Sequence, residues 1–238
     1  MSTPKLVTTR SVGRRAGTPG DRSLADQAYE DLRSRILDSR LRPGTALSVP
    51  ALARSLDISR SPVREAVQRL IHDGLATHVP HRGAEVARLE IADLIDIYVV
   101  KEPLTGLAAR LATTRLTQRD VETLRAMMNE QDSALAVGTP ENIFMSMDLK
   151  FHTFINEIAG NTTLLETMSQ FDNKTNLAFP SAWSDREYAR LSVQEHHAIA
   201  DALIAGDPDE ADRVSRAHVR KVRTRLARWH NHTGGCGC

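Results

Sequence analysis

The sequence is poor in aromatic residues, which narrows the ligands that it can bind. Only 4% of its 238 residues are Phe, Trp or Tyr, too few for the stacking platform that single-stranded nucleic acids require. With 41% hydrophobic and 26% charged residues, the composition is typical of a soluble, helix-rich protein with enough chain for two modest domains. We therefore do not expect single-stranded nucleic acid as a ligand.

Long hydrophobic runs and structural cysteines are missing as well. No stretch approaches the roughly 18 consecutive apolar residues of a membrane span, and residues 1–20 lack the apolar segment of a signal peptide. The two cysteines, Cys236 and Cys238, lie in a Gly-rich tail where a disulfide could not brace a core. We expect a cytoplasmic protein with no membrane partner, whose tail cysteines are either idle or bind metal.

The sequence also lacks the usual signatures of catalysis. It contains no Gly-rich phosphate loop in a fitting context, no nucleophile motif and no carboxylate with the spacing of a general base. These absences favour a binding protein over an enzyme.

Charge is plentiful but unevenly distributed. Residues 1–88 carry 15 Lys and Arg against 9 Asp and Glu, a net charge of +6, although the whole chain has only +1. The rest of the chain carries 16 basic and 21 acidic residues and is therefore acidic. A polyanion would dock on the first third.

Hydrophobic periodicity divides the first third into short helices. Residues 1–20 are rich in Ser, Thr, Gly, Pro and Arg, and they predict a disordered basic arm. Apolar residues at every fourth position from Leu24 predict a helix that ends near the turn at 42–44. A second short helix around 52–56 follows that turn.

A third helix and a hairpin come next, in the order of a winged helix-turn-helix. Ser59 or Ser61 can cap a helix that Gly74 ends, and residues 75–86 predict two short strands around a basic tip. In this geometry the first turn of the third helix faces base edges in the major groove, and the hairpin reaches the DNA backbone or the minor groove.

Basic and polar side chains occupy the positions that would face DNA. Arg60 and Arg64, at the start of the third helix, could each pair bidentately with guanine O6 and N7, which a lysine cannot do. Gly83 lets the hairpin turn tightly while Arg82 reaches outward. The candidate DNA-binding residues are Arg42, Ser59, Arg60, Ser61, Arg64, Gln68, Arg82 and Gly83.

The same segment carries a specific motif. Its residues are Leu41-Arg42-Pro43-Gly44, Leu52-Ala53, Ser59-Arg60-Ser61-Pro62-Val63-Arg64-Glu65-Ala66, Leu70, Asp73-Gly74-Leu75 and Arg82-Gly83. This pattern, over most of residues 24–88, resembles the DNA-binding domain of the GntR superfamily of transcription regulators. The resemblance implies a winged helix-turn-helix that binds double-stranded DNA. One departure is Ser48-Val49-Pro50, where many members carry a polar or acidic pair, so contacts from the second helix are not implied.

The rest of the chain places an acid and three histidines on predicted helices. Periodicity over residues 91–229 predicts about six helices. Asp148 and His152 share one apolar helical face, because residues four apart lie on the same side of a helix. His196 and His218 lie on two further apolar stripes, and we expect the four side chains to converge inside a bundle. One Asp and three His suit a divalent ion such as Zn²⁺, Ni²⁺ or Mn²⁺, with positions left for water or a ligand carboxylate.

The remaining histidines are not expected to bind this ion, since a surface or structural role is the usual one for a histidine. His197 is turned about 100° around the helix from its neighbour. Surface or DNA-proximal positions are expected for His72, His78, His81, His230 and His232.

A second resemblance covers the segment from about residue 91 to about residue 228. The matching residues are Asp148-Leu149-Lys150-Phe151-His152, Ala159-Gly160-Asn161, Glu195-His196, Ala202-Leu203, Gly206-Asp207 and His218. They resemble the FCD ligand-binding domain of FadR-type members of the same superfamily. The resemblance implies a dimer-forming bundle of six or seven helices, in whose metal-binding branch the corresponding Asp and three His hold the ion.

The first helix of the C-terminal segment departs from that pattern. Where relatives often place an arginine that clamps the carboxylate of the effector, this chain has Lys101, followed by Pro103 and Thr105. A lysine keeps the charge but loses the planar fork of the guanidinium group. Lys101 is therefore a candidate effector-binding residue, with a solvated surface role as the alternative.

Together these patterns predict a mainly α fold of two domains. We expect a basic arm (1–20), a winged helix-turn-helix domain (21–88), a helical bundle of six to seven helices for effector binding and dimerisation (89–230) and a flexible tail (231–238).

The leading functional hypothesis is a transcription regulator without enzymatic activity. A homodimer would bind a palindromic operator on the nucleoid, and a small carboxylate at the metal site would control its affinity. The alternative is a metal-dependent hydrolase or isomerase acting on small carboxylic acids, with an accessory DNA-binding domain. The ion could also be structural, or itself the signal. Repression and activation are both compatible with the sequence.

Overall fold

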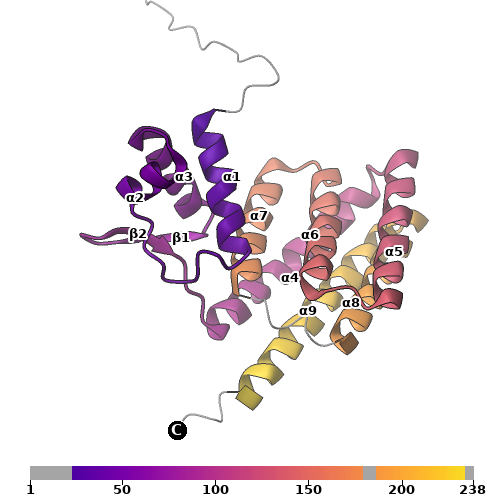
Figure 1. Ribbon diagram of the computed structural model, residues 1–238. Coiled ribbons are helices and arrows are strands. Elements are labelled where there is room, and N and C mark those ends of the chain that lie inside the picture. The colour runs from indigo at the N-terminus through magenta and orange to yellow at the C-terminus, as the bar shows by residue number, and fades with distance from the viewer. Residues whose placement is uncertain (1–22, 179–185, 234–238) are drawn as a thin grey trace, which may run out of the picture.

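The computed structural model describes residues 23–178 and 186–233, which form two domains (Figure 1). These residues contain nine helices and one two-stranded sheet, so the predicted mainly α fold is confirmed. The N-terminal domain holds α1 (Leu24–Leu37), α2 (Val49–Leu56), α3 (Arg60–His72), β1 (Ala76–Val79) and β2 (Gly83–Val86). The C-terminal domain holds α4 (Ile91–Thr113), α5 (Gln118–Val137), α6 (Glu141–Ile158), α7 (Thr162–Ala178), α8 (Arg186–Ala205) and α9 (Pro208–Thr233). The expected arm at 1–20 and the two tail cysteines lie outside the described residues.

Helix α1 begins at a capping box. The hydroxyl of Ser23 accepts a hydrogen bond from the backbone N–H of Asp26, and the Asp26 carboxylate accepts one from the backbone N–H of Ser23. Leu32 and Ile36 are buried as expected, but Leu24 is 52% exposed. Residues four apart on an α-helix are offset by about 40° around its axis. Leu24 and Ile36 are separated by three such intervals, so their side chains point about 120° apart.

Helix α3 packs its apolar face against α1 and leaves its polar face outward. Buried residues on α3 are Val63, Ala66, Val67 and Leu70. Two polar contacts hold the helices together: Arg69 Nη1 donates to Asp26 Oδ1 at 2.6 Å, and the Tyr29 hydroxyl donates to Asp73 Oδ2 at 2.5 Å. The orientation of α3 is thus fixed by its buried face and by its C-terminal end.

The hairpin after α3 forms the predicted wing. Strands β1 and β2 pair antiparallel, with Ala76 opposite Val86. The chain before α2 joins them, since the backbone N–H of Leu47 donates to the carbonyl of Ala84 at 2.8 Å. At the tip, Gly83 has a φ of 90°, a left-handed conformation that glycine adopts without strain.

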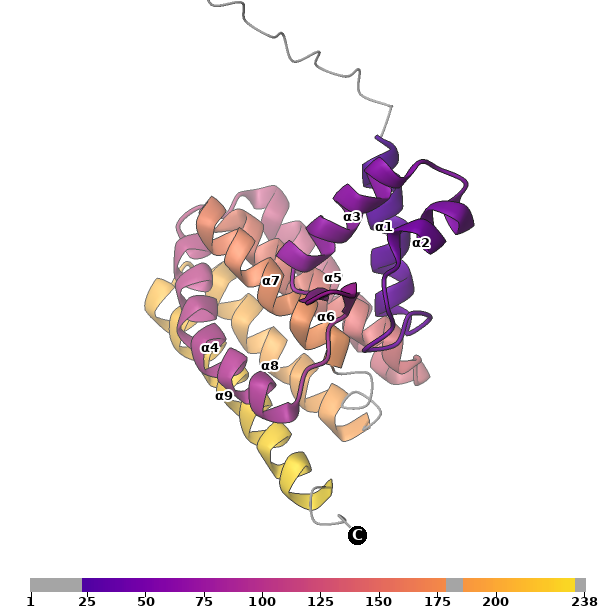
Figure 2. The ribbon, with the colours of Figure 1, turned by 90° about the vertical axis from the view of Figure 1, so that its left-hand side faces the viewer.

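The C-terminal domain is a bundle in which α4 and α9 pack along each other (Figure 2). The six described helices of this domain match the number that the sequence predicted. Its largest apolar cluster includes Ala109, Leu124, Phe151, Ile155, Ile199 and Leu203. None of the described helices is both long enough and apolar enough to cross a bilayer.

The two domains touch through α1 and α7, which lie next to each other (Figures 1 and 2). Leu177 on α7 is 6% exposed and belongs to the apolar cluster of the N-terminal domain. Arg33 Nη2 on α1 donates to Asn173 Oδ1 at 3.3 Å. The Lys174 side chain lies against Gly74, where an added Cβ would be 2.5 Å from Lys174 Cε. Helix α7 therefore contacts the domain that precedes it.

Candidate DNA-reading surface and metal centre

The first turn of α3 presents its cations to solvent. Ser59 is the N-cap residue, and its side chain makes no capping hydrogen bond in the described structure. Arg60, Ser61 and Arg64 are exposed, and so is Gln68 one turn further on. The sequence-predicted residues of this helix therefore share one open surface at its N-terminal end, where the helix dipole adds positive potential.

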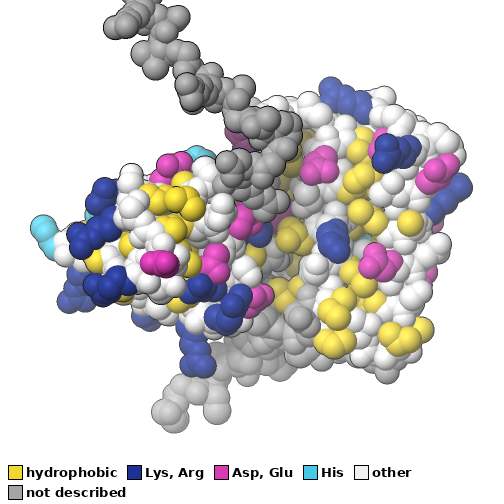
Figure 3. All heavy atoms as spheres, turned by 45° about the horizontal axis from the view of Figure 1, so that its top comes forward, with side chains coloured by type: hydrophobic (Ala, Val, Ile, Leu, Met, Phe, Trp, Pro, Cys, Tyr) yellow, Lys and Arg dark blue, Asp and Glu magenta, His cyan; other side chains and the backbone are white. Residues whose placement is uncertain are grey.

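The wing and the turn before α2 contribute further cations. Arg42, Arg82 and Gly83 are exposed, and His81 at the wing tip has a φ of 63°. In the space-filling view, Lys and Arg side chains gather over the N-terminal domain, which lies at the left (Figure 3).

These arginines differ from other arginines of the same domain in their partners. Within the described part of the chain, ion pairs in this domain are Asp31–Arg35, Asp38–Arg40, Asp26–Arg69 and His72–Asp73. Arg42, Arg60, Arg64 and Arg82 do not take part in them. No described carboxylate therefore neutralises these four arginines, and their charges can be offered to a polyanion.

The four residues proposed as metal ligands come together in the C-terminal domain. Asp148 and His152 lie on α6, His196 on α8 and His218 on α9. One side-chain nitrogen or oxygen of each lies within 4.8 Å of those of the other three. The histidines are 9%, 1% and 4% exposed, so the cluster is enclosed by the bundle.

Two hydrogen bonds fix which ring nitrogens face the cluster. Nδ1 of His196 lies 2.9 Å from Gln131 Oε1, and Nδ1 of His218 lies 2.7 Å from Glu195 Oε2. Both partners are oxygen acceptors, so each Nδ1 carries the proton and each Nε2 keeps a lone pair. Carboxylate and amide oxygens behind histidines are the usual supports of metal-ligating imidazoles.

The lone pairs face one another without a donor between them. His196 Nε2 lies 3.2 Å from Asp148 Oδ1 yet makes no hydrogen bond within the described residues, and His152 Nε2 lies 3.7 Å from the same oxygen. A buried acceptor without a partner is unfavourable. A cation among these four groups would satisfy all of them, which fits the predicted metal site.

Burial keeps the imidazoles of His152 and His218 neutral. It lowers the pKa of His152 well below its usual value, and the neighbouring Asp148 charge offsets only part of this effect. It also lowers the pKa of His218, although the hydrogen bond to Glu195 acts in the opposite direction. Burial alone would raise the pKa of Glu195, but its hydrogen bonds from His218 and Arg225 outweigh burial and hold the pKa at about 2. Neutral imidazole is the form that binds metal ions.

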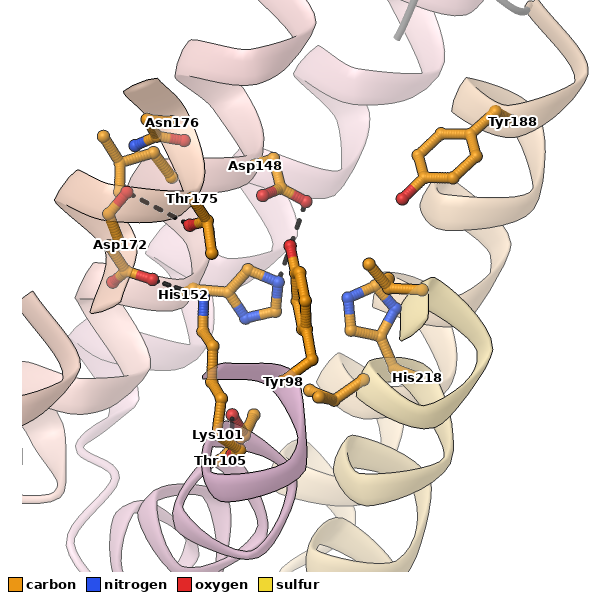
Figure 4. A pocket seen from close by; sticks show the side chains of 13 residues that line it. Tyr98, Lys101, Thr105, Asp148, His152, Asp172, Thr175, Asn176, Tyr188 and His218 are labelled. Atoms are coloured by element: carbon orange, nitrogen blue, oxygen red, sulfur yellow. Dashed lines mark hydrogen bonds and ion pairs between the residues drawn. The ribbon is translucent and has the colours of Figure 1, made fainter. Parts of the chain in front are cut away.

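A small cavity of about 40 Å³ adjoins the cluster. Figure 4 shows its lining side chains, with Asp148, His152 and His218 pointing toward one another and Tyr98 beside them. Burial raises the pKa values of Tyr98 and Tyr188, so both line the cavity as neutral phenols.

Lys101 reaches this cavity, as the effector-binding prediction requires, but it is already paired. Its Nζ lies 2.5 Å from Asp172 Oδ1 on α7, and both residues are buried. Sequence reasoning missed the roles of Asp172, Gln131 and Glu195, because each contacts a partner on another helix. Glu195 left one signal, its position beside His196.

The other histidines whose side chains are described lie outside the cluster, as the sequence predicted. His197 Nε2 lies 3.0 Å from Asp132 Oδ1, and the two side chains are 39% and 53% exposed. His72, His78 and His81 are exposed on the N-terminal domain. The side chains of His230 and His232 lie outside the described structure.

Comparison with known proteins identifies both domains. Residues 24–86 match the family described as "Bacterial regulatory proteins, gntR family", and residues 96–221 match the FCD domain. The Nta operon transcriptional regulator of Aminobacter aminovorans is 31% identical over 180 residues, which cover 76% of this chain and 83% of the relative. The HTH-type transcriptional repressor RspR of Escherichia coli K12 is 24% identical over 196 residues, 82% of this chain and 86% of that protein.

A solved structure shows the same fold. E. coli McbR/YncC superposes with a TM-score of 0.74 at 23% identity, covering 88% of this chain and 100% of that one. The named relatives are transcription regulators and not enzymes, so the hydrolase or isomerase alternative is set aside. The chain belongs to the GntR family of transcription regulators, in the branch whose C-terminal half is an FCD domain.

Proposed function

We propose that the protein is a homodimeric repressor that binds a palindromic operator, and that a small carboxylate at a metal site in the FCD domain controls its operator affinity. The observation that carries this proposal is the convergence of three buried imidazoles and one partly buried carboxylate, in which His196 Nε2 has no hydrogen-bond partner among the described residues. DNA binding follows from the family and from the exposed arginines of α3 and the wing.

The donor set suits a borderline divalent cation. Three nitrogens and one oxygen are the ligands preferred by Zn²⁺ and Ni²⁺, and Mn²⁺ accepts them as well. Asp148, His152, His196 and His218 would hold the ion, with Gln131 and Glu195 orienting two of the rings. Such an ion supplies Lewis acidity for a carboxylate at positions that the protein leaves open.

The outer face of α4 supports assembly of two copies. Val100 and Leu107 are 49% and 38% exposed, and Pro103 between them is exposed as well. Spacings of three, four and seven residues place these side chains on one stripe of the helix. A second copy packed on this stripe would bury it and would pair two reading helices for a two-fold symmetric operator.

Helix α7 offers a route from the cavity to the DNA-binding domain. Asp172, Thr175 and Asn176 line the cavity, as Figure 4 shows. Asn173 and Leu177, on the opposite side of the helix, contact the N-terminal domain. A ligand that shifts α7 would therefore move the surface on which the N-terminal domain rests.

The experiment compares two adjacent histidines. Full-length protein is loaded with Zn²⁺ and dialysed, its bound metal is measured, and its affinity for an operator selected from genomic fragments is determined with and without added 3-hydroxypropionate. His196→Gln should lose the ion and the response to the acid. His197→Gln, one residue away on the surface, should keep both. Metal retention by His196→Gln, or an operator affinity that never responds to the acid or to other small carboxylates, would refute the proposal.

A further inference from the structure

The cavity contains a buried ion pair that the metal cluster does not use. Lys101 and Asp172 have side chains only 10% and 8% exposed, and Lys101 Nζ lies 2.5 Å from Asp172 Oδ1. The pair stands on the cavity wall formed by α4 and α7, apart from Asp148 and His218 (Figure 4). A pair this deeply buried is unfavourable to break, because either partner alone would be an uncompensated charge.

The pair adds no net charge to the cavity, because Asp172 cancels Lys101. Among its described lining residues the charged ones are Lys101, Asp148 and Asp172, since the imidazoles are neutral. Their sum is one negative charge, and a divalent ion changes it to one positive charge. Behind His218, Glu195 pairs with Arg225 at 3.0 Å and with the exposed Lys221 at 3.5 Å, and none of the three lines the cavity.

We propose that the cavity selects small ligands with a net charge of −1, and that Asp172 is the residue that sets this selectivity. The inference rests on the proposed function, because it assumes a metal-bound carboxylate. One carboxylate balances the ion together with Asp148. A second carboxylate on the same ligand would find the Lys101 charge already taken by Asp172 and would remain buried without compensation.

The rest of the wall accepts neutral polar groups. The hydroxyls of Tyr98, Thr105 and Thr175 and the amide of Asn176 line the cavity. These groups can hydrogen-bond to a hydroxyl or carbonyl on the ligand but cannot neutralise a charge. The ligand class is therefore a short monocarboxylic acid with a hydroxyl or keto group at its far end.

The test uses two acids that differ only at one end. 3-Hydroxypropionate and malonate share a three-carbon chain, which ends in a hydroxyl in the first and in a second carboxylate in the second. Binding of each to Zn²⁺-loaded full-length protein is measured by calorimetry, and bound zinc is assayed afterwards because malonate also chelates free ions. Wild-type protein should prefer 3-hydroxypropionate. Asp172→Asn, which leaves Lys101 unpaired, should shift the affinity ratio toward malonate by about tenfold or more.

A double variant separates charge selectivity from folding. Lys101→Met combined with Asp172→Asn removes both charges, restores the original net charge and should keep the wild-type preference even if Asp172→Asn alone unfolds. Asp209→Asn, which removes an exposed carboxylate paired with Arg110, should change nothing. Tighter malonate binding by wild-type protein or by the double variant would overturn the inference and leave the proposed function intact. Failure of the wild-type protein to retain zinc would instead overturn the proposed function.

Discussion

Among the described residues, the exposed arginines at the start of α3 and on the wing have no ion-pair partner, whereas polar side chains around the cavity of the C-terminal domain are buried against carboxylates. Arg60 and Arg64 are exposed and engage in no ion pair within the described residues. Lys101 and His218 each meet a carboxylate inside the bundle. Exposed, unpaired cations suit a polyanionic partner. A cavity whose charges nearly cancel suits a small ligand that carries a single charge.

The difference predicts how each region responds to change. Removing one exposed cation removes one of many contacts to DNA, and solvent screens the interactions among the remaining exposed charges. Removing one buried charge leaves its partner uncompensated in a medium of low dielectric constant. Variants of the C-terminal cavity should therefore have the larger effects.

The largest effect is expected when the metal is removed. With an ion present at about a thousand times its dissociation constant, binding stabilises the folded chain by about 4 kcal/mol. Chelation should abolish this gain while helical circular dichroism persists, as measured by urea unfolding with Zn²⁺ and with chelator.

His196→Gln is the control for that measurement, since its unfolding curve should be the same under both conditions. A chain that loses its helices on chelation would make the ion structural. A chain that loses operator affinity without any carboxylate being involved would make the ion the signal itself.

Substitution of the reading helix should have the next largest effect. Arg64→Ala should weaken operator binding by about 1–3 kcal/mol and relax base preference at one position, because a bidentate guanine contact is lost. Fluorescence anisotropy with the operator and with single-base variants of it measures both quantities. Arg119→Ala, an exposed arginine on α5, should bind as wild type. Unchanged affinity in Arg64→Ala would remove α3 as the reader.

Both regions were partly predictable from the sequence, for different reasons. The reading helix is a local feature, since Ser59, Pro62 and Gly74 mark its ends and a 13-residue periodicity shows its outer face. Predicting the metal site required one further assumption, namely that the apolar faces of three helices meet in one core. That assumption held for Asp148, His152, His196 and His218 because each lies among buried apolar neighbours on its own helix.

Pairings between distant helices could not be read from the sequence. Asp172 is 71 residues from Lys101, and periodicity says which face a residue occupies but not which helix it meets. Glu195 was noticed as a neighbour of His196, whereas its contact is with His218, 23 residues away. The contact of Arg33 with Asn173 depends on how two domains sit against each other, which no local pattern encodes.

That contact allows a smaller, more specific test of communication between the regions. Asn173→Ala removes the hydrogen bond to Arg33, so the change in operator affinity caused by the effector should fall by about 0.5–2 kcal/mol, with little loss of metal or effector binding. Operator titrations with and without 3-hydroxypropionate measure the coupling. Ser169→Ala, an exposed site on the same helix, should leave the coupling intact. Equal coupling in both variants would exclude this contact from the route.

The smallest effect is expected at the wing. Arg82 lies exposed at its tip, where a phosphate contact would add affinity without selecting a sequence. Arg82→Ala should weaken operator and random DNA by the same factor and should reduce the slope of log affinity against log salt by about 0.9. Titrations at several salt concentrations separate this variant from Arg64→Ala, whose loss should be confined mainly to the operator. If Arg82→Ala instead lost affinity for the operator alone, the wing would contact bases. Base recognition would then be shared by the wing and α3, and the wing would not serve only as a phosphate contact.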